Sequence, residues 1–283
     1  MYLATARSAG GETAVVVDEK RGAAPAADVL PGAPSTALEV IERVAEPEFV
    51  AAVRKAPDSA FAPLEGTEFA APYTRPRKIW GIGLNYVEHA SDLTESVPEE
   101  PASFMKGDHT IIAPGEPIPL PSQSERVTAE AELGLVIGRE CHGVEDDDAL
   151  DHVWGVCTVL DQTAEDILAR NPRFLTRSKN FPGFFSFGPA VVPLSEALAG
   201  VGSIGELTVA TRLNGADERV NTVSHMRYSP AFLVGFHSRV MPLFPGDIIS
   251  TGTPGAVHIR PGDVAGCRIP GVGELTNPVV QGR

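Results

Sequence analysis

Two glutamates, Glu130 and Glu132, directly precede the apolar run that ends at Ile137 in the stretch AEAELGLVI. In a β-strand, residues i and i+2 project from the same face, so the two carboxylates would stand side by side. Neighbouring like charges repel unless water screens them or a cation lies between them. The spacing therefore predicts either a solvated strand face or a cation site.

The residues around these glutamates favour the solvated interpretation when they are taken alone. Every odd position from Val127 to Ile137 is apolar, and Thr128 precedes the glutamates on the even positions. This alternation is typical of a strand with one wet face. The even positions from Gly134 to Gly138 are not polar, however, which indicates that this face becomes covered further along the strand.

A third carboxylate, Asp161, ends the apolar run VWGVCTVLD. An acid at the end of a buried strand can face a cleft, or it can cap a following helix such as the one predicted in AEDILAR. Three carboxylates without a Cys or His pair beside them suit a hard, oxygen-preferring ion such as Mg²⁺ or Mn²⁺ better than zinc.

The composition argues against several classes of function. The chain has 283 residues and a formal net charge of −14, which repels nucleic acids and anionic membrane surfaces. Its three cysteines are widely spaced, which argues against a disulfide framework and a thiolate zinc site and makes a cytoplasmic setting the simplest. We see no signal peptide and no apolar run near the ~20 residues that span a bilayer. We expect a small-molecule substrate, and neither a nucleic-acid nor a membrane partner.

Residues 1–75 differ in pattern from the remainder and predict a small N-terminal domain. ETAVVVD predicts a strand, while STALEVIERV and EPEFVAAVRKA predict helices, the first with Ser35 as its N-cap. The Pro- and Gly-containing stretch that follows predicts a linker, so we place the boundary near Pro76. Residues 76–283 form the second predicted domain.

The second domain is predicted to be rich in short strands separated by Pro and Gly. Its clearest helix is SPAFLVGFHSRVM, with Ser229 as N-cap and Pro230 at the first helical position. Pro-Gly-Asp occurs at 245–247 and again at 261–263, and Pro followed by Gly suits the centre of a type II turn. We find no phosphate-binding Gly-rich loop and no nucleophile elbow.

Eight collinear segments resemble the fumarylacetoacetate hydrolase superfamily, in particular its acylpyruvate hydrolase and 2-hydroxyhepta-2,4-diene-1,7-dioate isomerase-like branch. They span about residues 76 to 280 and read KIWGIGLNYVEHASDL, PASFMKGDHTIIAPGEPIPLP, AEAELGLVIG, VWGVCTVLDQTAED, RSKNFPGFFSFGPAVV, LNG, FPGDIISTGTPGAV and PGDVAGC. The resemblance implies an α+β, β-rich fold, with a mixed β-sandwich or roll as catalytic domain after the small N-terminal α+β domain. It also implies a homodimer.

The resemblance implies that Glu130, Glu132 and Asp161 bind one divalent ion, Mg²⁺ or Mn²⁺, or Ca²⁺ in its place. Such an ion would cancel the repulsion between the carboxylates, polarise a 2-oxo acid and stabilise its enolate. Lys179, in RSKNF, matches the family lysine that reaches the substrate near the metal. Lysines are usually solvated, so this role depends on the motif.

Other positions match the family's lid and substrate contacts. His89 and Asp92 match a pair in which the acid orients the imidazole and the imidazole activates water. Thr253, in TGTP, matches a residue that commonly hydrogen-bonds substrate. The alternatives are a surface histidine for His89 and a simple turn residue for Thr253.

Two positions depart from the family pattern. Glu165 stands where relatives often carry arginine, and Arg219 stands where many carry glutamine. If both line the pocket and contact substrate, charge has been exchanged between its walls and the usual substrate is in doubt. The alternative is a surface ion pair that contributes little.

These inferences predict a metal-dependent hydrolase that cleaves a C–C bond in a 1,3-diketo acid, such as an acylpyruvate, through a metal-bound enolate. Isomerases, hydratases and decarboxylases of related 2-oxo acids share this chemistry and are alternatives. A catalytically silent relative that binds metal and ligand is a further alternative, suggested by Glu165.

Overall fold

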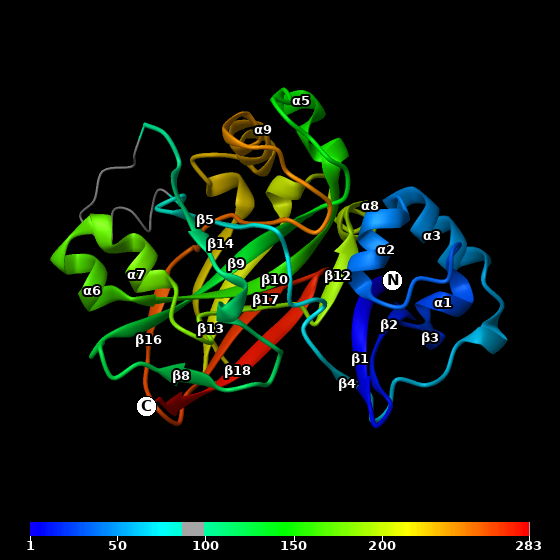
Figure 1. The fold of residues 1–283 in the computed structure, drawn as a ribbon, viewed down its shortest axis with the longest axis horizontal. Helices are drawn as coiled ribbons and strands as arrows, with labels where there is room; N and C mark the ends of the chain where they lie inside the picture. Colours follow the sequence, from blue (N-terminus) through cyan, green and yellow to red (C-terminus); the bar gives the residue numbers. More distant parts are fainter. Residues whose placement is uncertain (87–98, 283) are drawn as a thin grey trace.

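The computed structural model describes residues 1–86 and 99–282, and the structural statements below refer to these residues. Two β-sheets pack against each other and helices lie around them (Figure 1). The α+β, β-rich fold class with a mixed β-sandwich is therefore confirmed. Within the described residues, no helix is long and apolar enough to cross a membrane.

The larger sheet has 13 strands, and the order along its main path is β3-β2-β1-β12-β10-β9-β15-β5-β6. These strands are β1 (Tyr2–Ser8), β2 (Gly11–Asp18), β3 (Gly22–Pro25), β5 (Ile79–Gly83), β6 (Ala102–Lys106), β9 (Val127–Ile137), β10 (Val153–Ala164), β12 (Ala190–Pro193) and β15 (Ile248–Ser250). Four strands pair beside this path: β4 (Glu68–Phe69), β7 (Ile111–Ile112), β11 (Phe185–Phe187) and β16 (Ala256–Ile259).

The second sheet has 5 strands in the order β14-β13-β17-β18-β8. Their bounds are β8 (Ile118–Leu120), β13 (Thr208–Leu213), β14 (Ala216–Thr222), β17 (Val264–Ile269) and β18 (Gly273–Gln281). Within the described residues, the α-helices are α1 (Ala26–Val29), α2 (Ala37–Arg43), α3 (Glu46–Lys55), α5 (Asp146–Ala149), α6 (Glu165–Arg170), α7 (Leu175–Lys179), α8 (Leu194–Leu198) and α9 (Pro230–Val240). Helices α6 and α7 lie at the end of the molecule away from α1, α2 and α3 (Figure 1).

The N-terminal elements form as predicted, with one correction at a helix start. The N-cap of α2 is Thr36 and not Ser35. The Thr36 side chain accepts a hydrogen bond from the Glu39 backbone N–H, and the Glu39 carboxylate accepts one from the Thr36 backbone N–H. This reciprocal capping box satisfies two backbone donors, and the Ser35 backbone N–H and hydroxyl donate further bonds to the Glu39 carboxylate.

The N-terminal residues are joined to the rest of the chain through the large sheet. Strand β1 pairs antiparallel with β12, with Leu3 opposite Val191. Trp154 of β10 donates its indole N–H to the Val44 carbonyl at 2.9 Å and packs edge-on against Phe49 of α3, with ring centroids 5.0 Å apart. The boundary near Pro76 stays a prediction, but the two parts share one continuous sheet and a common core.

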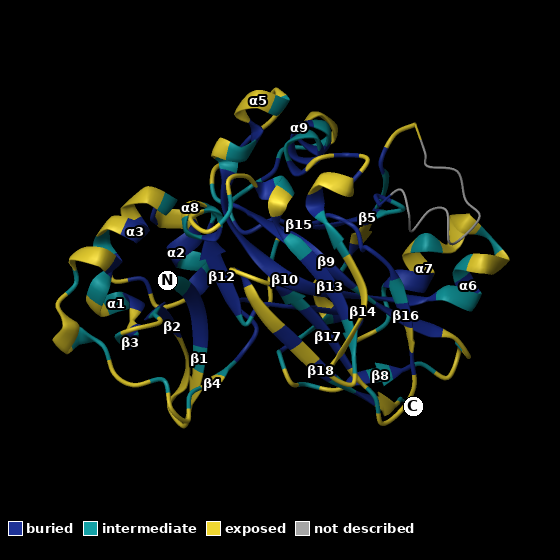
Figure 2. Cartoon of the chain, turned by 180° about the vertical axis from the view of Figure 1, so that it is seen from behind, coloured by how far each residue is buried: buried dark blue, intermediate teal, exposed yellow. Residues whose placement is uncertain are grey.

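The two faces of β9 have different surroundings, and this difference positions the carboxylates. Its odd-numbered residues, from Val127 to Ile137, pack in the core shared with the second sheet. Because strand side chains alternate, the even-numbered residues project from the other face of the large sheet. Figure 2 shows β9 and β10 as buried along most of their length. The predicted covering of the even positions is therefore confirmed for Gly134 and Val136, which are buried, whereas Gly138 is only partly buried.

Local turn and cap chemistry agrees with the sequence patterns. Gly246 and Gly262 have φ values of +84° and +96°, as a type II turn requires at its third position. The Ser229 hydroxyl caps α9 by accepting a hydrogen bond from the Phe232 N–H at 3.2 Å. All three cysteines are buried and free of disulfides.

Candidate functional site

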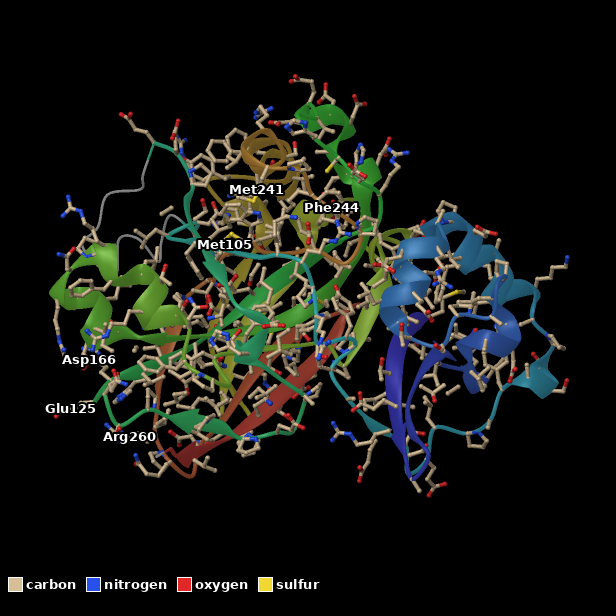
Figure 3. The ribbon with its side chains drawn as sticks, viewed as in Figure 1. Met105, Glu125, Asp166, Met241, Phe244 and Arg260 are labelled. Carbon is tan, nitrogen blue, oxygen red and sulfur yellow. The ribbon has the colours of Figure 1, made fainter. Side chains whose placement is uncertain are left out.

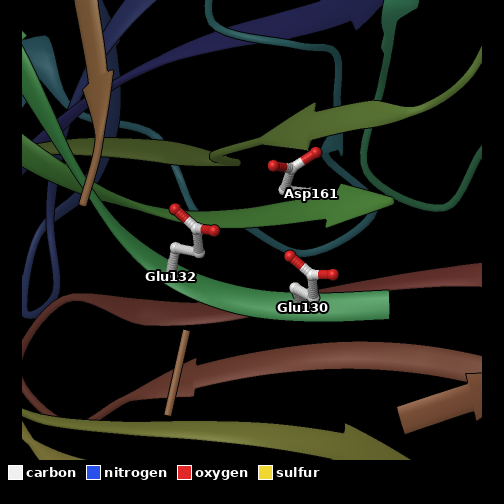
Figure 4. Close-up of side chains that lie close together, drawn as sticks. All are labelled: Glu130, Glu132 and Asp161. Atoms are coloured by element: carbon white, nitrogen blue, oxygen red, sulfur yellow. The ribbon is translucent and has the colours of Figure 1, made fainter. Parts of the chain in front are cut away.

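The three predicted metal ligands come together because of the register between two central strands. Strands β9 and β10 run antiparallel, with Asp161 directly opposite Glu130 and Val159 opposite Glu132. Cross-strand partners project from the same face, so all three carboxylates gather over one side of the sheet (Figure 4). Their candidate ligand oxygens all lie within 4.8 Å of one another.

These carboxylates do not form a solvated strand face. Glu132 is 1 % exposed and Asp161 is 0 % exposed, while the Glu130 side chain is 13 % exposed. Asp161 also does not cap the following helix, because the N-cap of α6 is Ala164. Buried carboxylates require paired charges or hydrogen bonds, so the surroundings of each one decide what the site can do.

Lys179, at the end of α7, provides one counter-charge. Its Nζ lies 2.8 Å from Oε2 of Glu130 and 2.8 Å from Oδ2 of Asp161, and its side chain is 5 % exposed. Burial acts to lower the pKa of Lys179, but the negative charges of Asp161 and Glu130 outweigh it and raise that pKa above its usual value. The structure thus brings Lys179 to the carboxylate cluster.

Lys106, at the end of β6, provides the second counter-charge and was missed by the sequence analysis. Its Nζ lies 2.6 Å from Oδ1 of Asp161 and also donates to the backbone carbonyl of Lys179. Burial lowers the pKa of Lys106 despite the attraction of Asp161. Its position in the sequence could have indicated that it is buried. Lys106 follows Phe104 by two residues in the family segment PASFMKGDHT, and residues i and i+2 of a strand project from the same face.

Neutral donors hold the two glutamates in orientation. Oε2 of Glu132 accepts hydrogen bonds from the Ser250 hydroxyl and, at 2.8 Å, from the Gly252 backbone N–H. Gly252 has a φ of +101°, and an added Cβ would meet Asn85 at 2.8 Å, so this turn of the TGTP segment requires glycine. Oε1 of Glu130 accepts a hydrogen bond from the Thr163 hydroxyl at 2.6 Å.

The charge balance of this cluster fits a divalent cation. Among the residues that the structure describes, two ammonium groups face three carboxylates, and the carboxylates offer the oxygen ligands that Mg²⁺, Mn²⁺ or Ca²⁺ prefers. Burial, and after it the negative charge of Asp161, raises the pKa of Glu132 to about 8. A dication would more than offset the single surplus negative charge and would favour the ionised form of Glu132. Glu130, Glu132 and Asp161 are therefore the residues that would hold it.

The Thr253 side chain is buried in the turn that follows Gly252. Its hydroxyl accepts a hydrogen bond from the Gly255 N–H at 3.2 Å and lies 3.1 Å from the Gly255 carbonyl oxygen. These contacts are those of a turn residue. The predicted contact between Thr253 and substrate stays a prediction.

The structure shows the immediate surroundings of Glu165 and of Arg219. Nε of Arg126 lies 2.8 Å from the Glu165 carboxylate, so Glu165 has a partner other than Arg219. The neighbouring Asp166 accepts a hydrogen bond from the Glu125 N–H at 3.3 Å, and both lie at the outer edge of the molecule (Figure 3). Arg219 is exposed on β14, and its aliphatic stem lies over Gly255. Their roles toward substrate stay predictions.

The expected water-activating pair, His89 and Asp92, lies outside the described residues. The structure therefore places the carboxylates and Lys179 of the predicted site together and adds Lys106, Ser250, Gly252 and Thr163 to them.

Known proteins share both this sequence pattern and this fold. The chain is 31 % identical over 259 residues to the mitochondrial oxaloacetate tautomerase FAHD2A of Homo sapiens, which covers 88 % of this chain and 81 % of that protein. A structure of 2-hydroxyhepta-2,4-diene-1,7-dioate isomerase from Mycobacterium marinum matches with a TM-score of 0.75 and 28 % identity, over 99 % of this chain and 98 % of that one.

A second solved structure is similar over the full length of both chains. It is a maleylpyruvate hydrolase from Sphingobium sp. SYK-6 in complex with manganese(II) and pyruvate, with a TM-score of 0.81, 26 % identity and 100 % coverage of each chain. The family model described as fumarylacetoacetate (FAA) hydrolase C-terminal matches residues 78–280. This match extends over most of the chain and confirms the resemblance found in the sequence, so the chain belongs to the fumarylacetoacetate hydrolase family.

Proposed function

We propose that the protein is a divalent-metal-dependent enzyme that forms and reprotonates the enolate of a small 2-oxo acid. The buried cluster of Glu130, Glu132 and Asp161, with Lys179 beside it, is the observation that carries this proposal. Bound Mg²⁺ or Mn²⁺ would act as a Lewis acid toward the 2-oxo acid and stabilise negative charge on its enol oxygen.

The protein's own residues would then bind and orient the substrate. The ammonium group of Lys179 is the cation of the cluster closest to Glu130, the most exposed of the three carboxylates, so it is placed to attract the substrate carboxylate. Lys106 is fully buried against Asp161 and Lys179 and would instead fix the position of both. The large sheet and its buried core exclude water beneath the cluster, which strengthens every charge interaction there.

Tautomerisation of a 2-oxo diacid such as oxaloacetate is the first candidate reaction. It requires only the removal of a proton from one atom of the substrate and its return to another. The human relative named as an oxaloacetate tautomerase supports it, since the similarity extends over 88 % of this chain. The same enolate chemistry would serve an isomerase, which the Mycobacterium marinum structure supports.

Hydrolysis of a C–C bond in an acylpyruvate-like 1,3-diketo acid is the second candidate reaction. It requires a base that activates water, and His89 oriented by Asp92 is the proposed base. The maleylpyruvate hydrolase structure with manganese(II) and pyruvate supports this candidate. We retain the predicted homodimer as part of the proposal, to be tested by light scattering in solution.

One assay separates these candidates. The protein is incubated with Mg²⁺ or Mn²⁺ and a panel of oxaloacetate, acylpyruvates and 2-hydroxydienoates, while enol absorbance and products are followed together. A change of enol absorbance without chain cleavage indicates a tautomerase or isomerase, and release of pyruvate with a carboxylic acid indicates a hydrolase.

The matched variants are Glu132→Gln, which alters the cluster, and Asp263→Asn, which alters a carboxylate in the turn between β16 and β17. We expect Glu132→Gln alone to lose activity. Equal inactivity of the wild type and Glu132→Gln on the whole panel would contradict the enzymatic proposal. Uptake of oxalate without turnover in calorimetry would then indicate a silent ligand-binding protein.

A further inference from the structure

In Glu130 and Asp161, one carboxylate oxygen contacts Lys179 and the other contacts a different residue. Oδ1 of Asp161 is bound by Lys106, and Oε1 of Glu130 is bound by Thr163. The other oxygens of these two side chains, Oδ2 of Asp161 and Oε2 of Glu130, are both bound by Nζ of Lys179 at 2.8 Å. Lys179 therefore bridges two of the three candidate metal ligands.

A divalent ion held by these carboxylates would compete with Lys179 for them. Mg²⁺ binds oxygen ligands at roughly 2.0–2.1 Å and Ca²⁺ at roughly 2.3–2.6 Å. Binding through the other oxygens would place the ion beside the buried Lys106 ammonium on Asp161 and beside the Thr128 and Thr163 hydroxyls on Glu130. The oxygens that contact Lys179 are the ones more readily released, because the Lys106 ammonium is also held by the Lys179 carbonyl and its side chain is completely buried.

We propose that the Lys179 ammonium is a built-in competitor of the divalent ion, serving as the counter-ion of Glu130 and Asp161 until the ion binds. A bound ion would replace the Lys179 ammonium as the counter-charge of Glu130 and Asp161, which would leave Lys179 available to the substrate carboxylate. The inference rests on the proposed function only in that the cluster binds a dication.

If Lys179 competes with the ion, replacing it with an uncharged residue should lower the stability of the metal-free protein and raise its affinity for the metal. Without the ammonium, Glu130 and Asp161 lose a neutralising partner, so the metal-free protein becomes less stable. The ion no longer has to separate Lys179 from these oxygens, and it no longer experiences the repulsion of a cation beside it, so metal affinity rises. A lysine that merely held the ligands in position would give the opposite result, since its removal would weaken metal binding.

The test is calorimetric titration of the full-length, metal-free protein with Mn²⁺ and Mg²⁺, together with thermal unfolding with and without the ion. For Lys179→Met we expect Kd to fall roughly tenfold or more, since a unit charge near the ion is worth at least that at an effective dielectric of about 20. We also expect a lower Tm without metal and a larger metal-induced rise in Tm than in the wild type. Lys179→Arg keeps the charge and should not tighten binding.

Two control variants separate competition from other effects. Lys78→Met breaks another buried ion pair, Nζ of Lys78 with Asp247 at 2.6 Å, and should lower Tm without changing Kd. Lys106→Met removes a cation equally near Asp161 but not one that holds Oε2 of Glu130, so its effect on Kd should be smaller than that of Lys179→Met. Unchanged or weaker metal binding by Lys179→Met, or equal tightening by Lys106→Met, would overturn the inference.

Failure of the inference can be told apart from failure of the proposed function. If wild-type protein binds no divalent ion under conditions in which it is folded, the proposed metal-dependent function is wrong. Competition between Lys179 and the ion then cannot occur. If wild-type protein binds the ion in a manner that depends on Glu132, and Lys179→Met binds no tighter, the function stands and the inference alone is wrong.

Discussion

The Nζ of Lys106 lies 2.6 Å from Oδ1 of Asp161, and both side chains are completely buried. The same ammonium donates a hydrogen bond to the backbone carbonyl of Lys179. Lys106 therefore fixes both the Asp161 carboxylate and the backbone of Lys179. Breaking a buried pair by removing one partner leaves an uncompensated charge.

Lys106→Met is therefore expected to destabilise the metal-free protein by on the order of 3 kcal/mol. Urea denaturation followed by circular dichroism measures this change. Lys20→Met, at an exposed lysine of the β2–β3 turn, is the matched control and should change stability by less than about 0.5 kcal/mol. Equal stability of the two variants would show that the Lys106–Asp161 contact contributes nothing to folding.

The two Pro-Gly-Asp turns provide a paired test of burial. Asp247 is fully buried and accepts hydrogen bonds from the Phe244 and Lys78 N–H groups in addition to its ion pair with the Lys78 ammonium. Asp263 accepts from the Arg260 N–H at 2.8 Å but is only half-buried. We expect Asp247→Ala to cost roughly 3 kcal/mol or more and Asp263→Ala about 1 kcal/mol. Similar losses of unfolding free energy would contradict this.

Gly134 lies on the same face of β9 as the two glutamates, where space is limited. An added Cβ would lie 2.7 Å from Sγ of Cys157 and 2.8 Å from a methyl group of Val159. Gly134→Ala should therefore cost about 1–3 kcal/mol through overpacking. Gly200→Ala, which meets nothing within 4 Å, is the matched control and should be neutral within about 0.5 kcal/mol. An equally small effect at Gly134 would mean that the strands separate easily.

We expect the buried His237 side chain to make the stability of the protein depend on pH. Its ring is buried in α9, Nδ1 lies 2.7 Å from the Leu233 carbonyl, and burial lowers the pKa of His237 below its usual 6.5. Below about pH 6.5, His237 binds a proton in the unfolded chain more readily than in the folded protein. His237 therefore does not reduce the free energy of unfolding above pH 6.5. The free energy of unfolding falls as the pH decreases through and below that value.

We expect His237→Asn, which keeps a donor for the Leu233 carbonyl, to reduce this loss of unfolding free energy between pH 7 and pH 5. The measurement is denaturant unfolding at each pH. His142→Asn, at an exposed histidine, should leave the pH profile as it is in the wild type. A His237→Asn profile as steep as that of the wild type would assign the pH dependence to other groups.

The sequence by itself determined the β-rich fold class, several element positions and the candidate ligands. Local rules acted there: Pro230 and Ser229 start a helix through their own backbone and side chain, and alternation places Glu130 and Glu132 on one face. The collinear family segments then added Asp161 and Lys179, which local patterns alone left open between a metal site, a helix cap and a solvated lysine.

Only the tertiary structure decided what surrounds those residues, because the partners come from distant parts of the chain. The β9–β10 register places Asp161 opposite Glu130, and β6 brings Lys106 across 55 residues of sequence to Asp161. Identical Pro-Gly-Asp turns likewise bury Asp247 but leave Asp263 half-exposed. A sequence pattern specifies the direction of a side chain from its own backbone, whereas burial and charge pairing depend on what the rest of the fold packs against it.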